Sequence, residues 1–319
     1  MLDRVFPKKN KNTQEESIDK IFSIYTARPS RPILITENKR DEAVYKKAFE
    51  GHSYVSTVKE FCNADGRSNV ISFISSIKEK DEAWTSKAKI RGIIDRDLAL
   101  SNNRLEKHSD NNCFVTDFSE MEMYAFLNED FSSFINQNLP MEYCLPYPET
   151  IELILRITSP LGAVRVIAHN PIEFYIQKED EPIGFDYENF DFRVEKKKSF
   201  IDNIEEENQD KIIIEVVKNI SKSPHGAEII VKVLDLTKSI KSVLGAYDIK
   251  LLVNSKMFES CLCRYILSPG RVKNNKDVRK LISAEEFFIK DARKFLISHP
   301  NIIAESELGR KVANLTPQG

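Results

Sequence analysis

The segment Ile90-Arg91-Gly92-Ile93-Ile94-Asp95-Arg96-Asp97 is an apolar run that ends in two carboxylates separated by one residue. Its β-branched residues predict a short buried strand. A second apolar run, Ile33 to Thr36, is followed by Glu37, and a third, Phe114 to Thr116, is followed by Asp117. We therefore expect three strands that each end in an acidic residue, and one acidic site at one edge of one sheet.

Helical periodicity separates these runs. Residues 40–49 and 70–77 carry apolar side chains at helical spacing, and the β-branched residues 54–58 predict a further strand. Strands therefore alternate with helices along the chain, and the polar stretch 98–112 is expected to be a loop. Such alternation is typical of a parallel α/β sheet with helices over both faces. Ligands of such sheets bind at the carboxyl ends of the strands, which is where the acids lie.

Changes in composition and periodicity along the sequence divide the chain into three parts. We expect a polar, helical extension over residues 1–30, an α/β domain over 31–139, and a mainly helical domain with a small hairpin over 140–319. Several prolines mark the last boundary, and the aromatic-rich segments 174–177 and 183–192 are the expected hairpin. Helices are expected in the third part over residues 149–158, 161–169, 199–220, 227–244, 256–267 and 284–297, with Pro160 separating the first two.

The amino-acid composition excludes few classes of protein. The net charge of −2 predicts no global attraction to a polyanion, so nucleic acid would have to bind to local basic patches. No apolar run is long enough for a membrane span, and the polar N-terminus lacks the core of a signal peptide. The five cysteines are scattered, apart from the pair Cys261 and Cys263. We therefore expect reduced thiols and a cytoplasmic protein that does not bind a membrane.

Grouped carboxylates indicate a divalent cation. Like charges within a few ångströms repel each other and raise each other's pKa, and a bound metal ion removes this conflict. Mg²⁺ prefers hard oxygen ligands, often one or two carboxylates with retained waters and substrate phosphates. The sequence has no cluster of His or Cys that would favour a softer metal. Glu37, Asp95 and Asp97 are thus the candidate ligands.

Each acid also has a purely structural interpretation. Strand ends and turns favour aspartate, so Asp97 could cap the loop and pair with Arg96. Asp41 and Glu42 are expected to be acids of the first helical turn, stabilised by the helix dipole. Glu120 is expected to face solvent. The two basic clusters, Lys196 to Lys198 and Arg271 to Lys280, could neutralise phosphates, and each taken singly is more typical of a solvated face.

Glu37 after the first strand, Asp41 and Glu42 opening the next helix, and Asp95-Arg96-Asp97 after a later strand together resemble the Toprim domain. Toprim is the metal-binding α/β domain shared by topoisomerases, DnaG-type primases and OLD-family nucleases. The segment Thr116 to Tyr124 is similar to a Toprim-like group found beside ABC-type ATPases in bacterial defence loci. Asn38 stands where the family often has glycine. Because asparagine tolerates the left-handed conformation, we expect the turn to be retained.

The resemblance implies a Mg²⁺-dependent phosphodiesterase, with Mn²⁺ as a possible substitute. Glu37 would act as the general acid or base or as a ligand of a metal-bound water. Asp95 and Asp97 would be metal ligands, and Glu122, ahead of Glu120, would be the further acid. For the defence-locus group it implies a tRNA substrate and a homodimeric active effector. It also implies an ABC-type ATPase partner that releases the effector when a phage protein is sensed.

Two other functions are consistent with the residues. The same fold could serve as a non-catalytic regulatory subunit of an ATPase complex, with a vestigial metal site. A nucleotide-binding or phosphotransfer enzyme of doubly wound topology is disfavoured because the chain lacks a glycine-rich phosphate loop. His225, in the turn Ser223 to Glu228, is a further candidate for a residue near a phosphate, although a capping or loop role is more typical.

Overall fold

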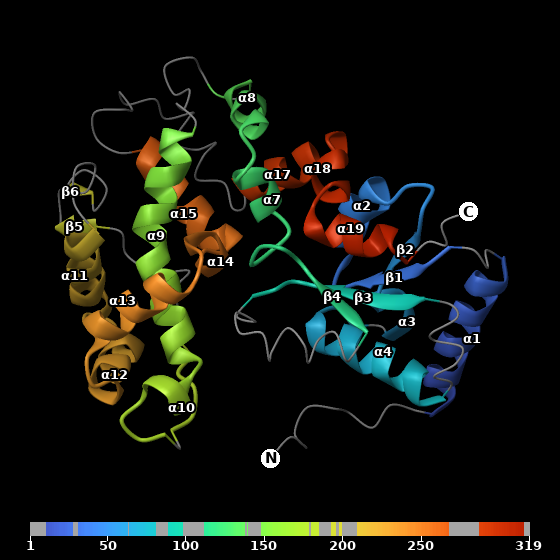
Figure 1. Ribbon diagram of the computed structural model, residues 1–319, viewed down its shortest axis with the longest axis horizontal. Coiled ribbons are helices and arrows are strands. Elements are labelled where there is room, and N and C mark those ends of the chain that lie inside the picture. Colours follow the sequence, from blue (N-terminus) through green and yellow to red (C-terminus); the bar gives the residue numbers. More distant parts are fainter. Residues whose placement is uncertain are drawn as a thin grey trace. The chain divides into compact units, whose positions relative to one another are not determined.

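The computed structural model describes residues 11–27, 31–62, 64–80, 89–97, 112–137, 139, 148–178, 180–184, 193–195, 198–199, 209–267 and 287–315. The chain forms two compact units (Figure 1). The first unit takes the chain up to Asp117 together with residues from Leu296 onward, and the second takes Phe118–Phe295. The boundary therefore lies earlier than the expected 139, and the chain returns to the first unit at its C-terminal end. The expected loop 98–112 lies outside the described residues, except for Asn112.

A parallel sheet of four short strands is the framework of the first unit (Figure 1). The strands lie in the order β2 (Tyr54–Thr57), β1 (Ile33–Thr36), β3 (Ile90–Ile94) and β4 (Cys113–Val115). All three neighbouring pairs are parallel. The expectation of a mostly parallel α/β sheet with flanking helices is confirmed, and the strand order, which the sequence did not reveal, places β1 and β3 side by side at its centre.

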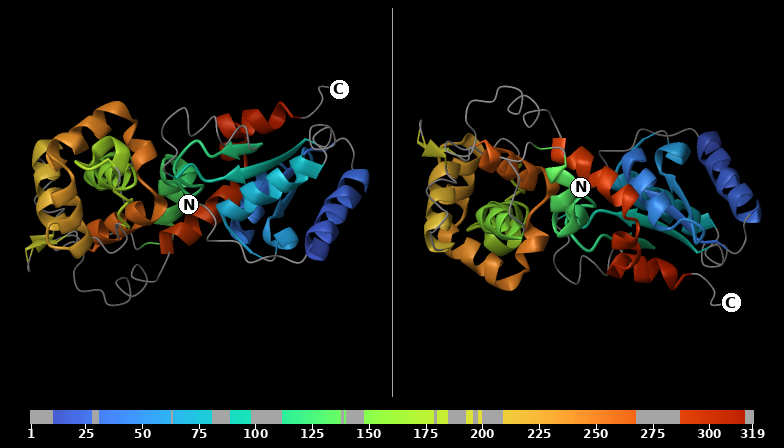
Figure 2. Two further views of the ribbon diagram at one scale, coloured as in Figure 1. Left: turned by 90° about the horizontal axis from the view of Figure 1, so that it is seen from below. Right: turned by 90° about the horizontal axis from the view of Figure 1, so that it is seen from above.

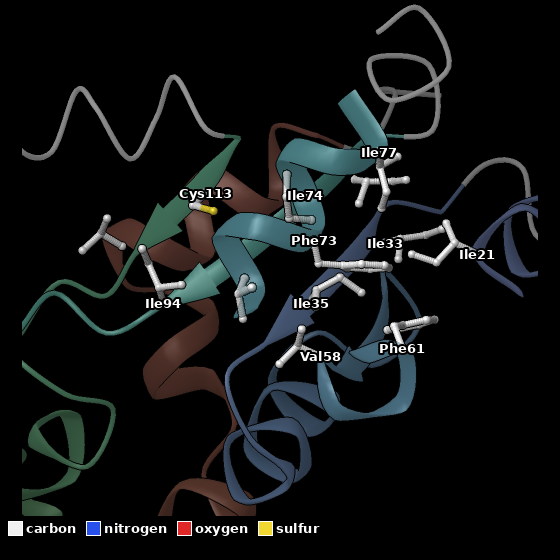
Figure 3. Packing of buried hydrophobic residues seen from close by; sticks show 13 residues of the cluster. Ile21, Ile33, Ile35, Val58, Phe61, Phe73, Ile74, Ile77, Ile94 and Cys113 are labelled. Atoms are coloured by element: carbon white, nitrogen blue, oxygen red, sulfur yellow. The ribbon is translucent and has the colours of Figure 1, made fainter. Parts of the chain in front are cut away.

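One face of the sheet is covered by α1 (Lys11–Ala27), α3 (Lys59–Cys62) and α4 (Arg67–Lys80). Figure 3 shows the side chains of this layer meeting those of the strands. Phe61 and Phe73 stack with their ring centroids 5.1 Å apart, and Ile21 of α1 is fully buried against the same cluster. The N-terminal helix is thus part of the core of the first unit. Burial also raises the pKa of the Cys113 thiol to about 12, so this cysteine is a core residue without reactive character.

The other face is covered by α2 (Lys39–Ala48) and by two helices from the C-terminal end, α18 (Asn301–Ala304) and α19 (Glu307–Ala313). The apolar face expected for α2 is buried. Asp117, which follows β4, accepts hydrogen bonds from the backbone N–H groups of Glu307 and Leu308, both at 2.9 Å. Because these N–H groups begin α19 and would otherwise lack partners, Asp117 caps a helix that lies 190 residues later in the chain.

The second unit is helical, as expected. Among its described residues, helices predominate beside a two-stranded antiparallel hairpin, and Figure 2 shows most of the helices surrounding α9. Its elements are α7 (Met123–Phe126), α8 (Asp130–Asn136), α9 (Glu149–Ala168), α10 (Pro171–Phe174), β5 (Arg193–Glu195), β6 (Lys198–Ser199), α11 (Gln209–Ile220), α12 (Pro224–Lys232), α13 (Leu236–Ala246), α14 (Ile249–Leu252), α15 (Ser255–Ile266) and α17 (Phe287–Ser298), whose last residues belong to the first unit.

Two helix predictions in this unit were wrong. Pro160 lies inside α9, which runs unbroken through the expected gap. The packing of α10, α11, α13, α14 and α15 around α9 stabilises a helix that loses one backbone hydrogen bond at the proline. The expected helix 227–244 is divided, because Val233 is extended and Asp235 caps α13 through the N–H of Lys238.

The predicted hairpin is tested only in part, because residues 185–192 of its second segment lie outside the described residues. Tyr175 forms an isolated antiparallel bridge with Val233, and the only short hairpin among the described residues is the pair β5 and β6. The sequence of 174–177 therefore pairs with a segment that follows α12, which no local pattern indicates. Within the described part of the chain, no helix has the length and apolar character needed to cross a bilayer.

Two helical glycines of the second unit provide a matched test of packing. A Cβ atom on Gly162 of α9 would lie 2.2 Å from the carbonyl oxygen of Leu252, whereas one on Gly245 of α13 would meet nothing within 4 Å. We predict that Gly162→Ala lowers the free energy of unfolding by about 1–3 kcal/mol or more, because backbone must move. Gly245→Ala is predicted to be neutral or stabilising by up to about 1 kcal/mol. Urea denaturation of both variants measures this, and equal effects would contradict the packing described for α9.

Candidate active site

The ends of β1 and β3 bring Glu37 and Asp95 together. The two strands pair in parallel with Thr36 opposite Ile93, so the residues that follow them emerge at the same edge. A side-chain oxygen of Glu37, Oε1, accepts a hydrogen bond from the backbone N–H of Asp95 at 2.9 Å. The two residues are 58 positions apart in sequence, and their convergence was the central expectation of the sequence analysis. The structure thus places the Glu37 carboxylate against the backbone of Asp95.

Arg67 completes the group from a third segment. It is the first residue of α4, and the preceding Gly66, with a φ of +104°, donates its N–H to the carbonyl oxygen of Glu37 at 2.8 Å. The Arg67 guanidinium lies with Nε 3.8 Å from Glu37 Oε1 and Nη1 3.6 Å from Asp97 Oδ2. Its Nη2 also donates to the backbone carbonyl of Asp95. One cation therefore lies between the first and last acids of the group.

The site is partly shielded from water. The side chain of Glu37 is 15% exposed, that of Arg67 28%, and that of Asp97 35%. Burial raises the pKa of the Glu37 carboxyl, and the N–H of Asp95 and the charge of Arg67 oppose this increase. The surroundings of Glu37 therefore disfavour its charged form.

The chain leaves β3 through a defined turn. Asp97 has a φ of +48°, in the left-handed region that aspartate adopts more readily than most residues. Arg96 donates from its backbone N–H to Thr116 Oγ1 at 2.8 Å and from Nε to the Thr116 carbonyl at 3.1 Å. The structural interpretation that paired Arg96 with Asp97 is therefore not what the structure shows, since Arg96 fastens the turn to the end of β4 and Asp97 faces Arg67.

Asn38 is accommodated differently from our expectation. Its φ of −149° and ψ of 170° are those of extended backbone, so no left-handed turn is required. Its Oδ1 accepts the N–H groups of Arg40 and Asp41, which makes Asn38 the N-cap of α2. Asp41 and Glu42 lie in the first turn, as predicted; Asp41 accepts a hydrogen bond from Asn38 Nδ2 at 2.7 Å and Glu42 pairs with Lys46. These two acids thus have structural partners of their own.

The fourth candidate, Glu122, belongs to the second unit. Its carboxylate forms an ion pair with Arg293, and both side chains are largely buried. Glu120, expected to face solvent, instead accepts the backbone N–H of Ser255 at 2.9 Å and its hydroxyl. Burial and the neighbouring Glu122 raise the pKa of Glu120. The structure therefore unites Glu37, Asp95 and Asp97 in the first unit, while Glu122 and Glu120 anchor contacts in the second.

The acids of the first unit are oxygen donors of the kind that bind hard divalent cations. Within the described part of the chain, no group of three or more His, Cys, Asp or Glu side chains is arranged to hold a metal ion. Glu37 and Asp97 nevertheless present carboxylate oxygens to one guanidinium, so oxygen ligands already face one centre of positive charge. Carboxylate oxygens are the ligands that Mg²⁺ and Mn²⁺ accept. Glu37, Asp95 and Asp97 are thus the residues that could hold such an ion.

The sequence analysis assigned Arg67 no role. A topological signal was present, because a helix that follows a parallel strand begins at the carboxyl edge of the sheet. The first residue of α4 must therefore lie near the ends of the strands. The basic cluster 271–280, and Lys196 and Lys197 of the other cluster, lie outside the described residues. His225 is an exposed residue of the first turn of α12.

Comparison with known proteins adds no assignment. No protein-family model matches the sequence, and no curated protein matches it. The site must therefore be interpreted from its own geometry.

The raised pKa of Glu37 predicts a pH-dependent stability. Because the pKa is higher in the folded state than the ordinary value of 4.5, the contribution of Glu37 to stability is full below that value. This contribution is lost as the pH rises through the raised pKa. Glu37→Gln keeps an oxygen for the N–H of Asp95 and removes the titration. We predict that wild-type protein loses stability relative to Glu37→Gln as the pH rises from the ordinary value of 4.5 through the raised pKa.

Urea denaturation of both proteins across this range, at constant ionic strength, measures the effect. Glu50→Gln is the matched control, because Glu50 is an exposed acid of the same unit that pairs only with the exposed Lys47. If wild-type protein gained stability relative to Glu37→Gln as the pH rose, the carboxylate would be favoured by its surroundings and the stated direction would be wrong.

Proposed function

We propose that the chain is a Mg²⁺-dependent phosphodiesterase of the Toprim class, able to use Mn²⁺, with Glu37, Asp95 and Asp97 as its site. One observation carries this proposal: at the carboxyl edge of the two central parallel strands, the carboxylates of Glu37 and Asp97 face Arg67, and Glu37 is hydrogen-bonded to the backbone N–H of Asp95. Ligands of open α/β sheets bind at this edge. The site therefore has the position, the charge and the ligand type that hydrolysis of a phosphodiester requires.

The residues have separable roles in this proposal. A bound Mg²⁺ would polarise a phosphoryl oxygen and acidify a water molecule. The side chain of Asp97 is more exposed than those of Glu37 and Arg67, and it is suited to hold the ion. The shielded Glu37, with its raised pKa, can exchange a proton closer to neutral pH than an exposed glutamate can. Its bond to the N–H of Asp95 fixes the carboxylate in one orientation.

The biological setting rests on the sequence resemblance. Within the defence-locus group, the segment Thr116 to Tyr124 resembles AriB, the effector of the PARIS anti-phage system. We propose accordingly that the substrate is RNA, with tRNA as the implied class, and that the protein is a toxic effector in the cytoplasm. In this proposal an ABC-type ATPase holds it inactive, and it acts as a homodimer after release in response to a phage protein.

A second function is favoured by one observation. Arg67 already balances Glu37 and Asp97, so the acids can persist without a metal ion. A regulatory subunit of an ATPase complex with a vestigial site would show this arrangement as well. Calorimetric titration with Mg²⁺ or Mn²⁺ separates the two functions, because a vestigial site has no binding that depends on Glu37.

The principal prediction concerns cleavage. Glu37→Gln and Asp95→Ala are predicted to reduce RNA cleavage by at least about 100-fold, because each removes a group that the reaction uses. Purified protein is incubated with tRNA and Mg²⁺, and cellular RNA is sequenced for new 5′ ends after expression. Circular dichroism confirms that each variant folds, and Glu50→Gln serves as the control with unchanged cleavage. Variants as active and as toxic as the wild type would refute the assignment of the site.

A further inference from the structure

We propose that Arg67 is a built-in counter-ion, which a divalent cation displaces from the acids and which then holds a phosphate oxygen of the nucleic acid. Arg67 would thus be a substrate-positioning residue that is released when the metal binds. The inference rests on the proposed function, because it concerns the same site. It adds a residue outside the acidic set and a coupling between metal and substrate.

The counter-ion role follows from the contacts. The Arg67 guanidinium faces Glu37 Oε1 at 3.8 Å and Asp97 Oδ2 at 3.6 Å, and donates to the carbonyl of Asp95. It therefore contacts the carboxylates of Glu37 and Asp97 and the backbone of Asp95. Carboxylates gathered in a partly buried site repel each other unless a positive charge compensates them. In the metal-free protein Arg67 supplies that charge.

The two carboxylate contacts of Arg67 are longer than direct hydrogen bonds. Both distances to carboxylate oxygens exceed the length of a charge-assisted hydrogen bond, and the Nε–H of Arg67 is buried without a hydrogen-bond partner. The direct hydrogen bond of the guanidinium goes to the backbone carbonyl of Asp95. Leaving an N–H group unsatisfied costs free energy, so the guanidinium is held mainly by charge. A divalent ion carries twice that charge and suits the same oxygens better.

Two features of Arg67 favour a contact with a phosphate. Its side chain is 28% exposed and therefore reaches solvent. Arg67 also begins a helix of 14 residues, whose dipole favours an anion at this end. The planar fork of arginine matches two phosphate oxygens. A phosphate at the carboxyl edge would satisfy the donors that the acids leave unmet.

Metal and substrate would therefore bind cooperatively. The ion releases the guanidinium from the acids, and the released guanidinium increases the affinity for the phosphate backbone. By linkage, the phosphate increases the affinity for the ion by the same factor. Without metal, the charge of Arg67 is directed to Glu37 and Asp97.

The test compares Arg67→Ala and Arg67→Gln with wild type, and Arg310→Ala, an exposed arginine of α19, is the control. Calorimetric titration with Mn²⁺ and Mg²⁺ is predicted to show at least about 5-fold tighter binding in both Arg67 variants, because the ion has no counter-ion to displace. Cleavage of tRNA at saturating metal is predicted to fall at least about 10-fold, because the phosphate contact is lost. Arg310→Ala should match wild type in both measurements.

A measurement on wild-type protein guards against variants that fail to fold. The ¹H–¹⁵N signal of Arg67 Nε is followed by NMR while Mg²⁺ is added, and displacement predicts a shift that saturates with metal binding. An unchanged signal at saturation, or Arg67 variants that bind metal equally or more weakly, would overturn the inference while leaving the phosphodiesterase proposal intact. Wild-type protein without Glu37-dependent metal binding would overturn the phosphodiesterase proposal itself, and this inference with it.

Discussion

Parallel pairing of β1 with β3 is the constraint on which the candidate site depends. Because the strands run in the same direction and in register, the residues after them must turn away from the sheet at one edge. Glu37 and Asp95 thereby meet across 58 residues of intervening chain. The cost of this meeting is the concentration of negative charge, and Arg67 offsets it from the start of α4. Backbone topology thus creates both the acidic group and the place for its counter-ion.

Local patterns predicted the framework of the first unit well. Each of the four strands is a short β-branched or apolar run, and α2 buries the apolar face that its helical spacing indicated. The convergence of Glu37, Asp95 and Asp97 followed because strand polarity is a general property of α/β sheets. Strand order, in contrast, depends on long-range packing, and no local pattern encodes it.

The predictions that failed involve contacts between segments distant in sequence. Pro160 normally ends a helix, but the helices packed around α9 compensate for its missing N–H. Glu120 was expected to face solvent, because the short segment around it gives no sign of Ser255, its partner 135 residues later. Arg67 was overlooked because a single arginine in a polar loop carries no periodic signal. Its role becomes visible only when the sheet edge is assembled.

The capping of α19 by Asp117 has a consequence for how the protein folds during its synthesis. The unit that carries the acids is discontinuous, since the chain leaves it at Asp117 and rejoins it at Leu296. The cover of the second face, which α2 begins, is therefore completed only after the helical unit has been translated. The first unit consequently reaches its final packing only when a segment made after the second unit has emerged.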